Sequence, residues 1–319
     1  MKHFFILNPA AGKGKKIQKL IEEIHTVCKA RGVDYVVHFT ERVGEATEFV
    51  RSCCKNTAEQ LRFYACGGDG TVNETASGLV GCENAELGII PMGTGNDFVR
   101  NFENKEYFFD VNAQLDGEAE KIDVLKYNDK YSVNMINVGF DCEVVKQVSK
   151  NRRNVFVPSK IAFMVGVVQK FFSMPDVKAK LLIDGVEQER SNFQLCAIAN
   201  GSYCGGGFYA APISDLRDGT VDVCMISPVS RMKLLQLVGY YKAGTYLEKV
   251  KDKNVINYVK CSSVEMKFET PTDICADGEI EKVSELKIST VKDAVNFCVP
   301  KGCKMFHPEI PRERMPSRV

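Results

Sequence analysis

Between residues 4 and 90, short apolar runs alternate with segments of helical periodicity, and this order constrains the fold more than any other feature of the chain. The apolar runs expected to be strands are residues 4–7, 33–39, 61–66 and 87–90. The segments with apolar residues on one helical face are 17–32, 45–54 and 71–79. Such an alternation is typical of a parallel β-sheet covered by helices. The sequence therefore predicts an α/β domain with a doubly wound parallel sheet.

After about Asp123 the pattern changes to short alternating runs, which favour β-structure. Turn dipeptides separate these runs at Asn128-Asp129, Asp184-Gly185, Asp218-Gly219 and Asp277-Gly278. Asn, Asp and Gly adopt positive φ angles easily and are therefore common in tight hairpins. Two helical segments, residues 159–173 and 231–250, interrupt this half. We expect a mainly-β second domain.

Three turns of unusual composition, residues 8–14, 67–71 and 93–97, follow three of the expected strands. Parallel strands end at one edge of the sheet, so these turns should converge where such folds bind ligands. Glycine lets backbone amides approach a ligand, and the free N–H groups of the helix that each turn should open attract anions. Thr71 and Glu74 fit a capping box that would start a helix directly after Gly70. The turns together predict a phosphate cradle, although each alone could be a tight strand-to-helix turn.

The turns match neither a dinucleotide fingerprint nor a P-loop, because G-x-G-x-x-G after a strand and G-x-x-x-x-G-K-[ST] are both absent from the sequence. Two carboxylates, Asp69 and Asp97, lie inside the turns and would repel phosphate unless a divalent cation lay between them. The predicted ligand is therefore a nucleoside triphosphate with Mg²⁺.

Composition excludes several other classes. With 42 Lys and Arg against 41 Asp and Glu, the net charge of +1 disfavours nucleic-acid binding. Thirteen cysteines occur without a C-x-x-C motif or suitably spaced histidines, so most thiols are expected to be small buried residues in a reducing cytosol. The longest uncharged stretch, residues 191–214, is too polar to span a bilayer. We expect a cytoplasmic protein with no transmembrane segment.

In this order and spacing, the motifs resemble the catalytic domain of the diacylglycerol kinase family, above all its soluble bacterial lipid kinases, which are related to sphingosine and ceramide kinases. The resemblance rests on Asn8-Pro9 with Gly12-Lys13, on Gly67-Gly68-Asp69-Gly70-Thr71-Val72-Asn73-Glu74 and on Gly93-Thr94-Gly95-Asn96-Asp97-Phe98. The stretch from Ala211-Pro212 to Asp218-Gly219, and Ala276-Asp277-Gly278-Glu279, extend it over nearly the whole chain. Gly-Gly-Asp-Gly-Thr alone would not suffice, because NAD kinases share it.

The resemblance implies a phosphofructokinase-like ATP domain of residues 1–122 plus about 294–310, and a β-sandwich lipid domain of residues 123–293. A last strand at residues 294–299 would return to the first domain, ATP would lie in an interdomain cleft, and residues 311–319 would form a flexible tail. The residues implied in ATP binding are Asn8, Ala10, Ala11, Gly12, Lys13, Gly14, Thr40, Gly67, Gly68, Asp69, Gly70, Thr71, Val72, Asn73, Gly93, Thr94, Asn96 and Asp97.

Carboxylates are the candidates for the chemistry, because phosphoryl transfer needs charge neutralisation and a group that takes the hydroxyl proton. Asp69 is the first candidate, either as a metal-linked residue or as the base, and the alternative is a turn-forming role. By resemblance, Asp277 and Glu279 lie where the family has its general base, and the sequence does not choose between them. Asp97 and Asp123 are expected in the same charged network.

A second constellation consists of Asp215, Asp218 and Thr220. Oxygens at i, i+3 and i+5 around a glycine turn can converge on one hard cation. The resemblance implies a structural Mg²⁺ there, while the sequence alone is equally compatible with an ordinary hairpin.

Lipid contact is expected from the helical segment 159–173 and from basic residues beside it. Its apolar residues could line an acyl pocket or form plain core; they are Ile161, Phe163, Met164, Val167, Phe171 and Phe172. The basic residues, which could hold the enzyme at an anionic leaflet, are Arg152, Arg153, Lys160 and Lys170.

The function that the sequence predicts is an ATP-dependent lipid kinase, with diacylglycerol converted to phosphatidic acid. Another acceptor lipid (a sphingoid base, ceramide or a polyprenol), an NAD kinase, and a non-catalytic nucleotide or lipid sensor are the alternatives. The expected partner is a lipid substrate at the membrane surface, reached by peripheral association with its inner face. A homodimer is compatible with the sequence, which sets no oligomeric state.

Overall fold

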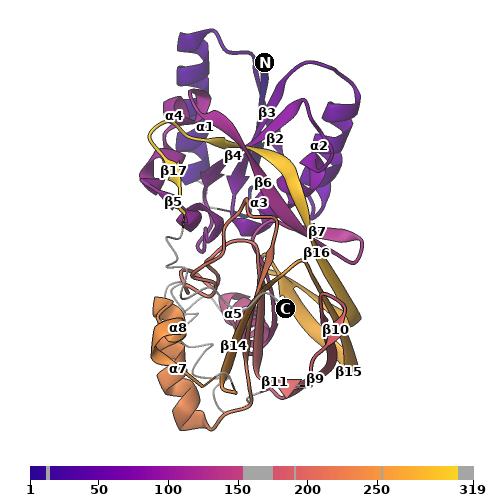
Figure 1. The fold of residues 1–319 in the computed structure, drawn as a ribbon. Coiled ribbons are helices and arrows are strands. Elements are labelled where there is room, and N and C mark those ends of the chain that lie inside the picture. Colours follow the sequence, from indigo (N-terminus) through magenta and orange to yellow (C-terminus); the bar gives the residue numbers. More distant parts are fainter. Residues whose placement is uncertain (12–14, 154–174, 190–191, 253, 308–319) are drawn as a thin grey trace. The chain divides into compact units, whose positions relative to one another are not determined.

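The computed structural model describes residues 1–11, 15–153, 175–189, 192–252 and 254–307 of the chain (Figure 1). The chain divides into two compact units. Unit 1 is Met1–Val124 with Lys292–Phe306, and unit 2 is Leu125–Val291 with His307. Gly12, Lys13 and Gly14, the helical segment 159–173 and the tail 311–319 lie outside the described residues, so the predictions made for them stay predictions.

Unit 1 is built on a parallel sheet. Its strands are β1 (Lys2–Leu7), β2 (Tyr35–Phe39), β3 (Leu61–Gly67), β4 (Ala85–Pro91) and the end of β16 (Glu279–Val299). The spatial order is β2-β1-β3-β4-β16, and every neighbouring pair is parallel. The winding direction reverses at β1, because β2 lies on one side of it and β3 on the other. The returning strand pairs Asn296 with Glu86 and Phe297 with Leu87.

Three helices cover this sheet on both faces: α1 (Lys15–Arg31), α2 (Glu45–Lys55) and α3 (Asp69–Leu79). The alternation of strand side chains directs Phe5 and Tyr64 to the face that packs against Leu20 and Ile24 of α1. Phe4 points to the opposite face and meets Phe49 of α2 at 5.8 Å between ring centroids. The doubly wound arrangement is therefore confirmed.

The start of α3 differs from its prediction. The helix begins at Asp69, and the N-cap residue is Gly68, whose backbone is extended. Thr71 therefore lies inside the first turn, and Glu74 Oε2 accepts from the backbone N–H of Ala46, 3.3 Å away. The predicted capping box is wrong, because Gly68 and Gly70 allow the helix to begin three residues earlier than it would with Thr71 as the N-cap.

The rest of unit 1 consists of short elements. After β4 come the 3₁₀ helices η1 (Phe98–Asn101) and η2 (Lys105–Phe109), β5 (Phe102–Glu103), α4 (Val111–Leu115) and, near the C-terminus, β17 (Lys304–Met305). The turn at residues 93–97 therefore leads into one turn of 3₁₀ helix rather than the α-helix expected after it. Antiparallel pairing of β17 with β5 ties the C-terminal residues to this unit.

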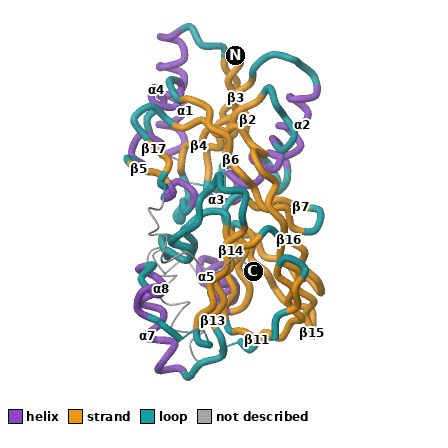
Figure 2. The backbone as a smooth tube through the Cα atoms, in the orientation of Figure 1, coloured by secondary structure: helices purple, strands orange, loops and turns teal. Residues whose placement is uncertain are grey.

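Unit 2 consists mainly of β-strands, as predicted (Figure 2). Its strands are β6 (Glu118–Tyr127), which starts in unit 1, β7 (Lys130–Ser132), β8 (Met135–Gly139), β9 (Val177–Ile183), β10 (Val186–Glu187), β11 (Asn192–Phe193), β12 (Leu195–Ala199), β13 (Val221–Ile226), β14 (Ile256–Cys261), β15 (Ser263–Ala276) and the first part of β16. The order β14-β13-β12-β8-β15-β16 is antiparallel throughout. The turn residues Asn128, Asp184 and Asp277 have positive φ, as their hairpin sequences predict.

Among the described residues of unit 2, three helices accompany these strands: α5 (Phe140–Arg153), α7 (Arg231–Ala243) and α8 (Tyr246–Lys249). The segment expected as one helix over 231–250 is thus divided, because Gly244 ends α7 with a left-handed backbone at φ 68°. No helix among the described residues has the length and apolar composition needed to cross a bilayer.

Candidate functional site

The carboxyl ends of β1, β2 and β3 meet at one edge of the unit 1 sheet. After β1, the Asn8 backbone N–H donates to Cys66 O of β3 at 3.2 Å. Asn8 Nδ2 donates to Thr71 Oγ1 at 3.3 Å, and its Oδ1 accepts from Ala10 N at 2.9 Å. After β2, Thr40 N donates to Leu7 O at 2.9 Å. The first predicted turn, as far as it is described, and Thr40 are therefore brought together.

The second and third turns touch through their backbones. Gly67 O accepts from Met92 N at 2.8 Å and from Gly93 N at 3.2 Å. A Cβ atom on Gly93 would lie only 2.6 Å from the Cα of Gly68. Glycine is therefore required at residue 93 by close backbone approach, which a side chain would prevent.

Asp69 links the two turns. Its Oδ1 accepts from the backbone N–H of Asp97 at 2.7 Å and, at 3.4 Å, from that of Phe98. Burial raises the pKa of the Asp69 carboxyl above its ordinary value, although these amide donors oppose the rise. A buried carboxylate of this kind gains from a nearby cation.

The other oxygens of Asp69 and Asp97 converge above Gly95. A Cβ on Gly95 would lie 2.8 Å from Asp69 Oδ2 and 3.4 Å from Asp97 Oδ2. Glycine therefore keeps open a small space faced by two carboxylate oxygens. Mg²⁺ in nucleotide sites takes one or two carboxylates and completes its shell with phosphate oxygens and water. The residues present fit that ion.

Other predicted ATP-binding residues lie around these turns. Thr94 is exposed, and the Asn96 side chain donates to Gly93 O at 3.0 Å. Asn73 Oδ1 is buried with no hydrogen-bond partner among the described residues, so it can accept from a ligand. Arg100, which the sequence analysis missed, places Nε 3.2 Å from Asp97 Oδ1. The sequence signal for this contact was the spacing, because Arg100 follows Asp97 by three residues and such pairs meet within one helical turn.

The two candidate bases of unit 2, Asp277 and Glu279, differ in burial and in hydrogen bonding. Asp277 is buried, and its two oxygens accept from the backbone N–H groups of Val133 (2.7 Å), Asn134 (3.2 Å) and Met135 (2.9 Å) and from Ser132 Oγ (2.9 Å). Glu279 is exposed at the start of β16, and no hydrogen bond or ion pair holds its carboxylate among the described residues. Asp277 therefore organises the β7–β8 connection, while Glu279 is available for contact with a substrate.

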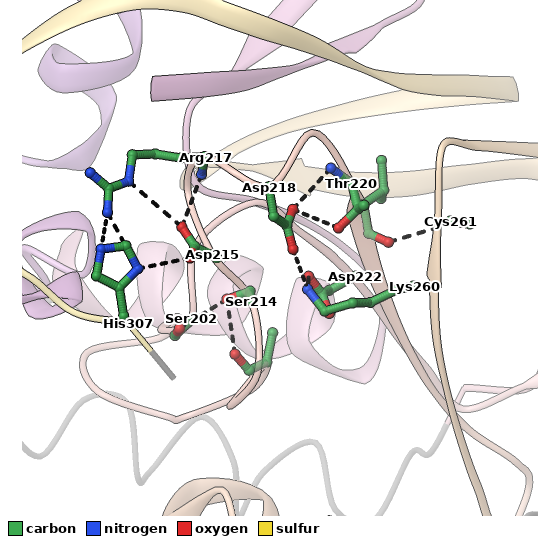
Figure 3. A network of polar contacts seen from close by, with 12 residues as sticks. Ser202, Ser214, Asp215, Arg217, Asp218, Thr220, Asp222, Lys260, Cys261 and His307 are labelled. Carbon is green, nitrogen blue, oxygen red and sulfur yellow. Dashed lines mark hydrogen bonds and ion pairs between the residues drawn. The ribbon is translucent and has the colours of Figure 1, made fainter. Parts of the chain in front are cut away.

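Of the predicted cation ligands, Asp218 and Thr220 contact each other, whereas Asp215 faces other partners (Figure 3). Asp218 Oδ2 lies 2.6 Å from Lys260 Nζ, and its Oδ1 accepts from Thr220 Oγ1 at 2.6 Å. Lys260 Nζ also contacts the buried Asp222, at 3.0 Å.

Asp215 faces a different set of partners: its Oδ1 accepts from Arg217 N at 3.1 Å, and its Oδ2 lies 3.0 Å from His307 Nδ1. Each carboxylate is thus occupied by its own donors, and the described residues contain no cluster of three or more acidic, His or Cys ligands. The Mg²⁺ site expected at these residues therefore stays a prediction, and no step is assigned to a cation here.

Asp123 is fully buried, and its Oδ1 accepts from the backbone N–H of Asp293 at 2.8 Å. It thereby holds β16 where this strand enters unit 1.

A further carboxyl group, Asp141 of α5, was not singled out from the sequence. It lines a small apolar cavity of unit 2 together with Phe140, Leu195, Leu234 and Val238, among others. Tyr241 Oη donates to Asp141 Oδ2 at 3.2 Å. Burial raises the pKa of Asp141 to about 7. Asp141 follows an apolar strand directly, in Gly139-Phe140-Asp141. Many residues at strand ends have this position, so the sequence indicated a functional role for Asp141 only weakly.

Comparison with known families accounts for both units. Residues 2–127 match the model of the diacylglycerol kinase catalytic domain. Residues 134–299 match the YegS C-terminal NAD kinase beta sandwich-like domain. The chain belongs to the diacylglycerol kinase catalytic-domain family. The expected family and the two-part architecture are confirmed, and membership of a kinase family implies the use of ATP.

Relatives in this family cover most of the chain at low identity. A diacylglycerol kinase of Mycobacterium tuberculosis is 26% identical over 93% of this chain and 94% of its own length. A diacylglycerol kinase of Bacillus subtilis is 25% identical over 86% of this chain and 88% of its own. These relatives support a lipid kinase and leave the acceptor lipid open.

Solved structures share the fold. A diacylglycerol kinase from Bacillus anthracis superposes with a TM-score of 0.69 at 22% identity, covering 93% of this chain and 96% of that one. An NAD kinase from Archaeoglobus fulgidus, solved in complex with ATP, has a TM-score of 0.54 at 15% identity, with 94% of each chain covered.

Proposed function

We propose that this protein is an ATP-dependent kinase that transfers the γ-phosphate of ATP to a lipid hydroxyl, with diacylglycerol as acceptor and phosphatidic acid as product. One observation carries the proposal: Asp69 Oδ1 accepts from Asp97 N at 2.7 Å, which joins two glycine turns at the carboxyl edge of a parallel sheet. Membership of a family with relatives named diacylglycerol kinase supports the acceptor class.

Unit 1 supplies the nucleotide site in this proposal. The backbone amides of Gly68 and of the first turn of α3 offer N–H donors to phosphate oxygens. Asp69 and Asp97 would hold Mg²⁺ above Gly95. When bound, this ion neutralises the charge on the β- and γ-phosphate oxygens. The protein's own contribution is to keep both carboxylates fixed and to exclude a side chain from the space between them.

Glu279 is the proposed general base. A base must bring a free carboxylate oxygen within hydrogen-bond reach of the acceptor hydroxyl. Asp277 could do this only by releasing backbone amides that it holds at 2.7–3.2 Å, which would leave buried N–H groups without acceptors. Glu279 is exposed and has no such task, so it can take the proton as the hydroxyl oxygen attacks phosphorus.

Unit 2 supplies the lipid contacts in this proposal. The cavity around Asp141 is lined by apolar side chains and holds the Asp141–Tyr241 pair, but its volume of about 20 Å³ is too small for an acyl chain. We therefore expect the acyl contacts from the segment 159–173, which lies outside the described residues. We propose that the protein is cytoplasmic and meets its lipid at the inner face of the membrane by peripheral association.

The test is a transfer assay with γ-labelled ATP and Mg²⁺. Mixed micelles contain diacylglycerol, a sphingoid base, ceramide or a polyprenol in separate reactions, and NAD is tested without micelles. Labelled phosphatidic acid is the expected product. Label on another lipid would correct the acceptor, and label on NAD alone would overturn the lipid-kinase assignment. If a nucleotide raises the melting temperature but no acceptor receives phosphate, the protein is instead a sensor.

Two variants test the assigned roles in that assay. Glu279→Gln should lower kcat at least about 100-fold while leaving the melting temperature unchanged. Glu281→Gln is its matched control, because Glu281 is two residues further along the same strand and its carboxylate is held by Lys130, at 2.7 Å, and by a hydrogen bond from Tyr127. Full activity of Glu279→Gln would remove Glu279 from the mechanism.

A further inference from the structure

Helix α7 has apolar side chains on two opposite faces (Figure 1). Its inner face is formed by Leu234, Leu237 and Tyr241, which are buried in a core cluster of unit 2. On the outer face, Met232 is 77% exposed and Leu235 is 52% exposed. A helix that covers a core ordinarily has polar and charged residues on the side that faces water. The outer face of α7 departs from that pattern.

The apolar and small residues of the outer face form one row along the helix. They are Met232, Leu235, Gly239 and Ala243, and steps of three and four positions place them above one another. All four are exposed, as is Gln236 beside them. A Cβ on Gly239 would meet nothing within 4 Å, so no described residue covers the middle of the row. We call these four residues the outer apolar row.

The charges of α7 are all positive. The helix contains Arg231, Lys233 and Lys242 and no acidic residue, which gives it a net charge of +3, and all three side chains are exposed. With 3.6 residues per turn, Arg231 and Lys242 lie along one side of the outer apolar row and Lys233 lies along the other. In the following segment 246–252, two lysines and two acidic residues cancel. The whole chain has a net charge of only +1, so the positive charge is local to α7.

Both ends of α7 are fixed, so its outer face is a preformed surface. Ser230 is the N-cap residue, and its side chain accepts from Lys233 N at 3.4 Å. At the other end, Gly244 N donates to Tyr241 O at 3.2 Å. The Tyr241 hydroxyl in turn donates to Asp141 Oδ2 at 3.2 Å, which ties the last turn to α5. The exposure of the outer apolar row is therefore a property of the folded helix.

We infer that the outer apolar row of α7 is a membrane-docking surface whose partner is a bilayer that contains anionic lipids. An apolar face with basic side chains beside it is typical of a helix that lies in the plane of the interface, with its apolar residues below the headgroups. Lysine and arginine near an anionic leaflet are attracted to it. A second copy of this chain is a poorer partner, because two such faces would bring two charges of +3 together. The inference rests on the proposed lipid-kinase function and names the surface through which the protein meets its lipid.

The first experiment measures binding of the full-length protein to vesicles in the absence of ATP. Sedimentation with phosphatidylcholine vesicles is compared with sedimentation with vesicles that also contain phosphatidylglycerol. Binding to the anionic vesicles should be at least about tenfold tighter, and added salt should weaken it. Equal binding to both kinds of vesicle, or binding to neither, would overturn the inference.

A double variant tests the apolar contribution. Met232→Ser combined with Leu235→Ser should weaken binding to the anionic vesicles at least about tenfold, because the apolar contacts with the acyl chains are lost. Val186→Ser is the matched control, since Val186 of β10 is 52% exposed, as Leu235 is, and should leave binding unchanged. Size-exclusion chromatography accompanies the assay. A change of oligomeric state in the double variant alone would assign the row to a second copy and contradict the inference.

Lys233→Glu tests the contribution of charge. Lys233 lies three residues after the N-cap Ser230, where a glutamate completes a capping box, so the helix should remain folded. Binding to the anionic vesicles should nevertheless weaken at least about fivefold. Lys178→Glu makes the same change at an exposed position of β9 and should have no such effect. An equal loss in both variants would show that α7 has no special role.

A tryptophan placed in the row reports its depth. The chain contains no tryptophan, so Met232→Trp has a single indole emission. Anionic vesicles should shift this emission to shorter wavelength, and lipids brominated on the acyl chain should quench it. Val186→Trp, the control, should respond to neither. An unshifted emission of bound Met232→Trp would show that another surface meets the bilayer.

Phosphoryl transfer separates this inference from the proposed function. With a water-soluble short-chain diacylglycerol, the double variant should be as active as the original chain, whereas with anionic vesicles as the source of acceptor it should lose activity with its binding. Vesicles that an active enzyme does not bind would refute the docking surface alone. Binding through α7 without transfer to any acceptor would refute the kinase function and support the docking surface.

Discussion

Asp69, the first residue of α3, accepts at Oδ1 a hydrogen bond from the backbone N–H of Asp97, 2.7 Å away and 28 positions later in the chain. This contact joins the turns after β3 and β4. It leaves Oδ2 directed toward the space above Gly95, which Asp97 Oδ2 also faces. One carboxylate therefore has two tasks, since one oxygen holds the turns together and the other is available to a cation.

The first prediction separates these tasks with Asp69→Asn. The amide Oδ1 can still accept from Asp97, and no charge is buried, so the free energy of unfolding should fall by no more than about 1 kcal/mol or should rise. Lipid phosphorylation should fall at least about 100-fold, because the cation loses a carboxylate ligand. Urea unfolding and the γ-phosphate assay measure the two effects. More than a tenth of the original activity would argue against a role for this charge.

The second prediction concerns the close approach of two backbones. Gly93→Ala places a Cβ 2.6 Å from the Gly68 Cα, and neither atom belongs to a flexible side chain. The variant should lose about 1–3 kcal/mol of stability and weaken nucleotide binding, as measured by urea unfolding and by calorimetric titration with ATP. Gly239→Ala is the control. Its Cβ would meet nothing within 4 Å on α7, so it should be neutral or more stable by up to about 1 kcal/mol.

The third prediction distinguishes Asp277 from Glu279 by stability. Asp277→Ala removes the acceptor of three buried backbone N–H groups and of Ser132 Oγ, so the free energy of unfolding should fall by on the order of 3 kcal/mol. Glu279→Gln should leave it within about 0.5 kcal/mol of the original. Urea unfolding compares the two variants. An equally stable Asp277→Ala protein would show that the hydrogen-bond network is dispensable.

The fourth prediction is a pH dependence that arises from Asp141. Burial raises its pKa in the folded state to about 7, from an ordinary value of 3.8. The folded state therefore binds this proton more tightly than the unfolded state does, and the contribution of Asp141 to stability decreases as the pH rises from about 4 to about 7. Asp141→Asn removes that decrease.

Stability curves of both proteins between pH 4.5 and 8 test this prediction. The difference should shift in favour of Asp141→Asn with rising pH, by at most about 1.4 kcal/mol per pH unit within the window. The other carboxyls are common to both proteins and cancel in the difference. A difference that does not vary with pH would show that Asp141 keeps an ordinary pKa.

The elements of unit 1 could be read from local sequence because their signals are local. Apolar runs and helical periodicity located β1 to β4 and the helices between them, with ends that differ from the structure by no more than two residues. The start of α3 was misjudged for a physical reason. Thr71 and Glu74 have the spacing of a capping box, but Thr71 is buried against Gly67 and Asn8, so packing overrides the local preference.

For the candidate site as well, some features could be predicted from local sequence and others could not. Turn composition alone indicated that Asp69 and Asp97 belong together, because strands of a parallel sheet end at one edge. The environment of Asp277 could not be predicted, since its partners Ser132 to Met135 lie more than 140 positions away. Asp218 and Asp215 face Lys260 and His307, which come from other segments. Spacing within one turn cannot reveal such partners.

The sequence by itself thus determined the alternation of strands and helices, the position of the glycine turns and the family to which the chain belongs. Tertiary structure alone decided which carboxylates are occupied and which are free. The reason is that backbone preferences act over a few residues, whereas the protonation and reactivity of a side chain depend on burial and on charges brought near by packing. Asp277 and Glu279 make this plain, because they stand two positions apart and only the fold assigns them different environments.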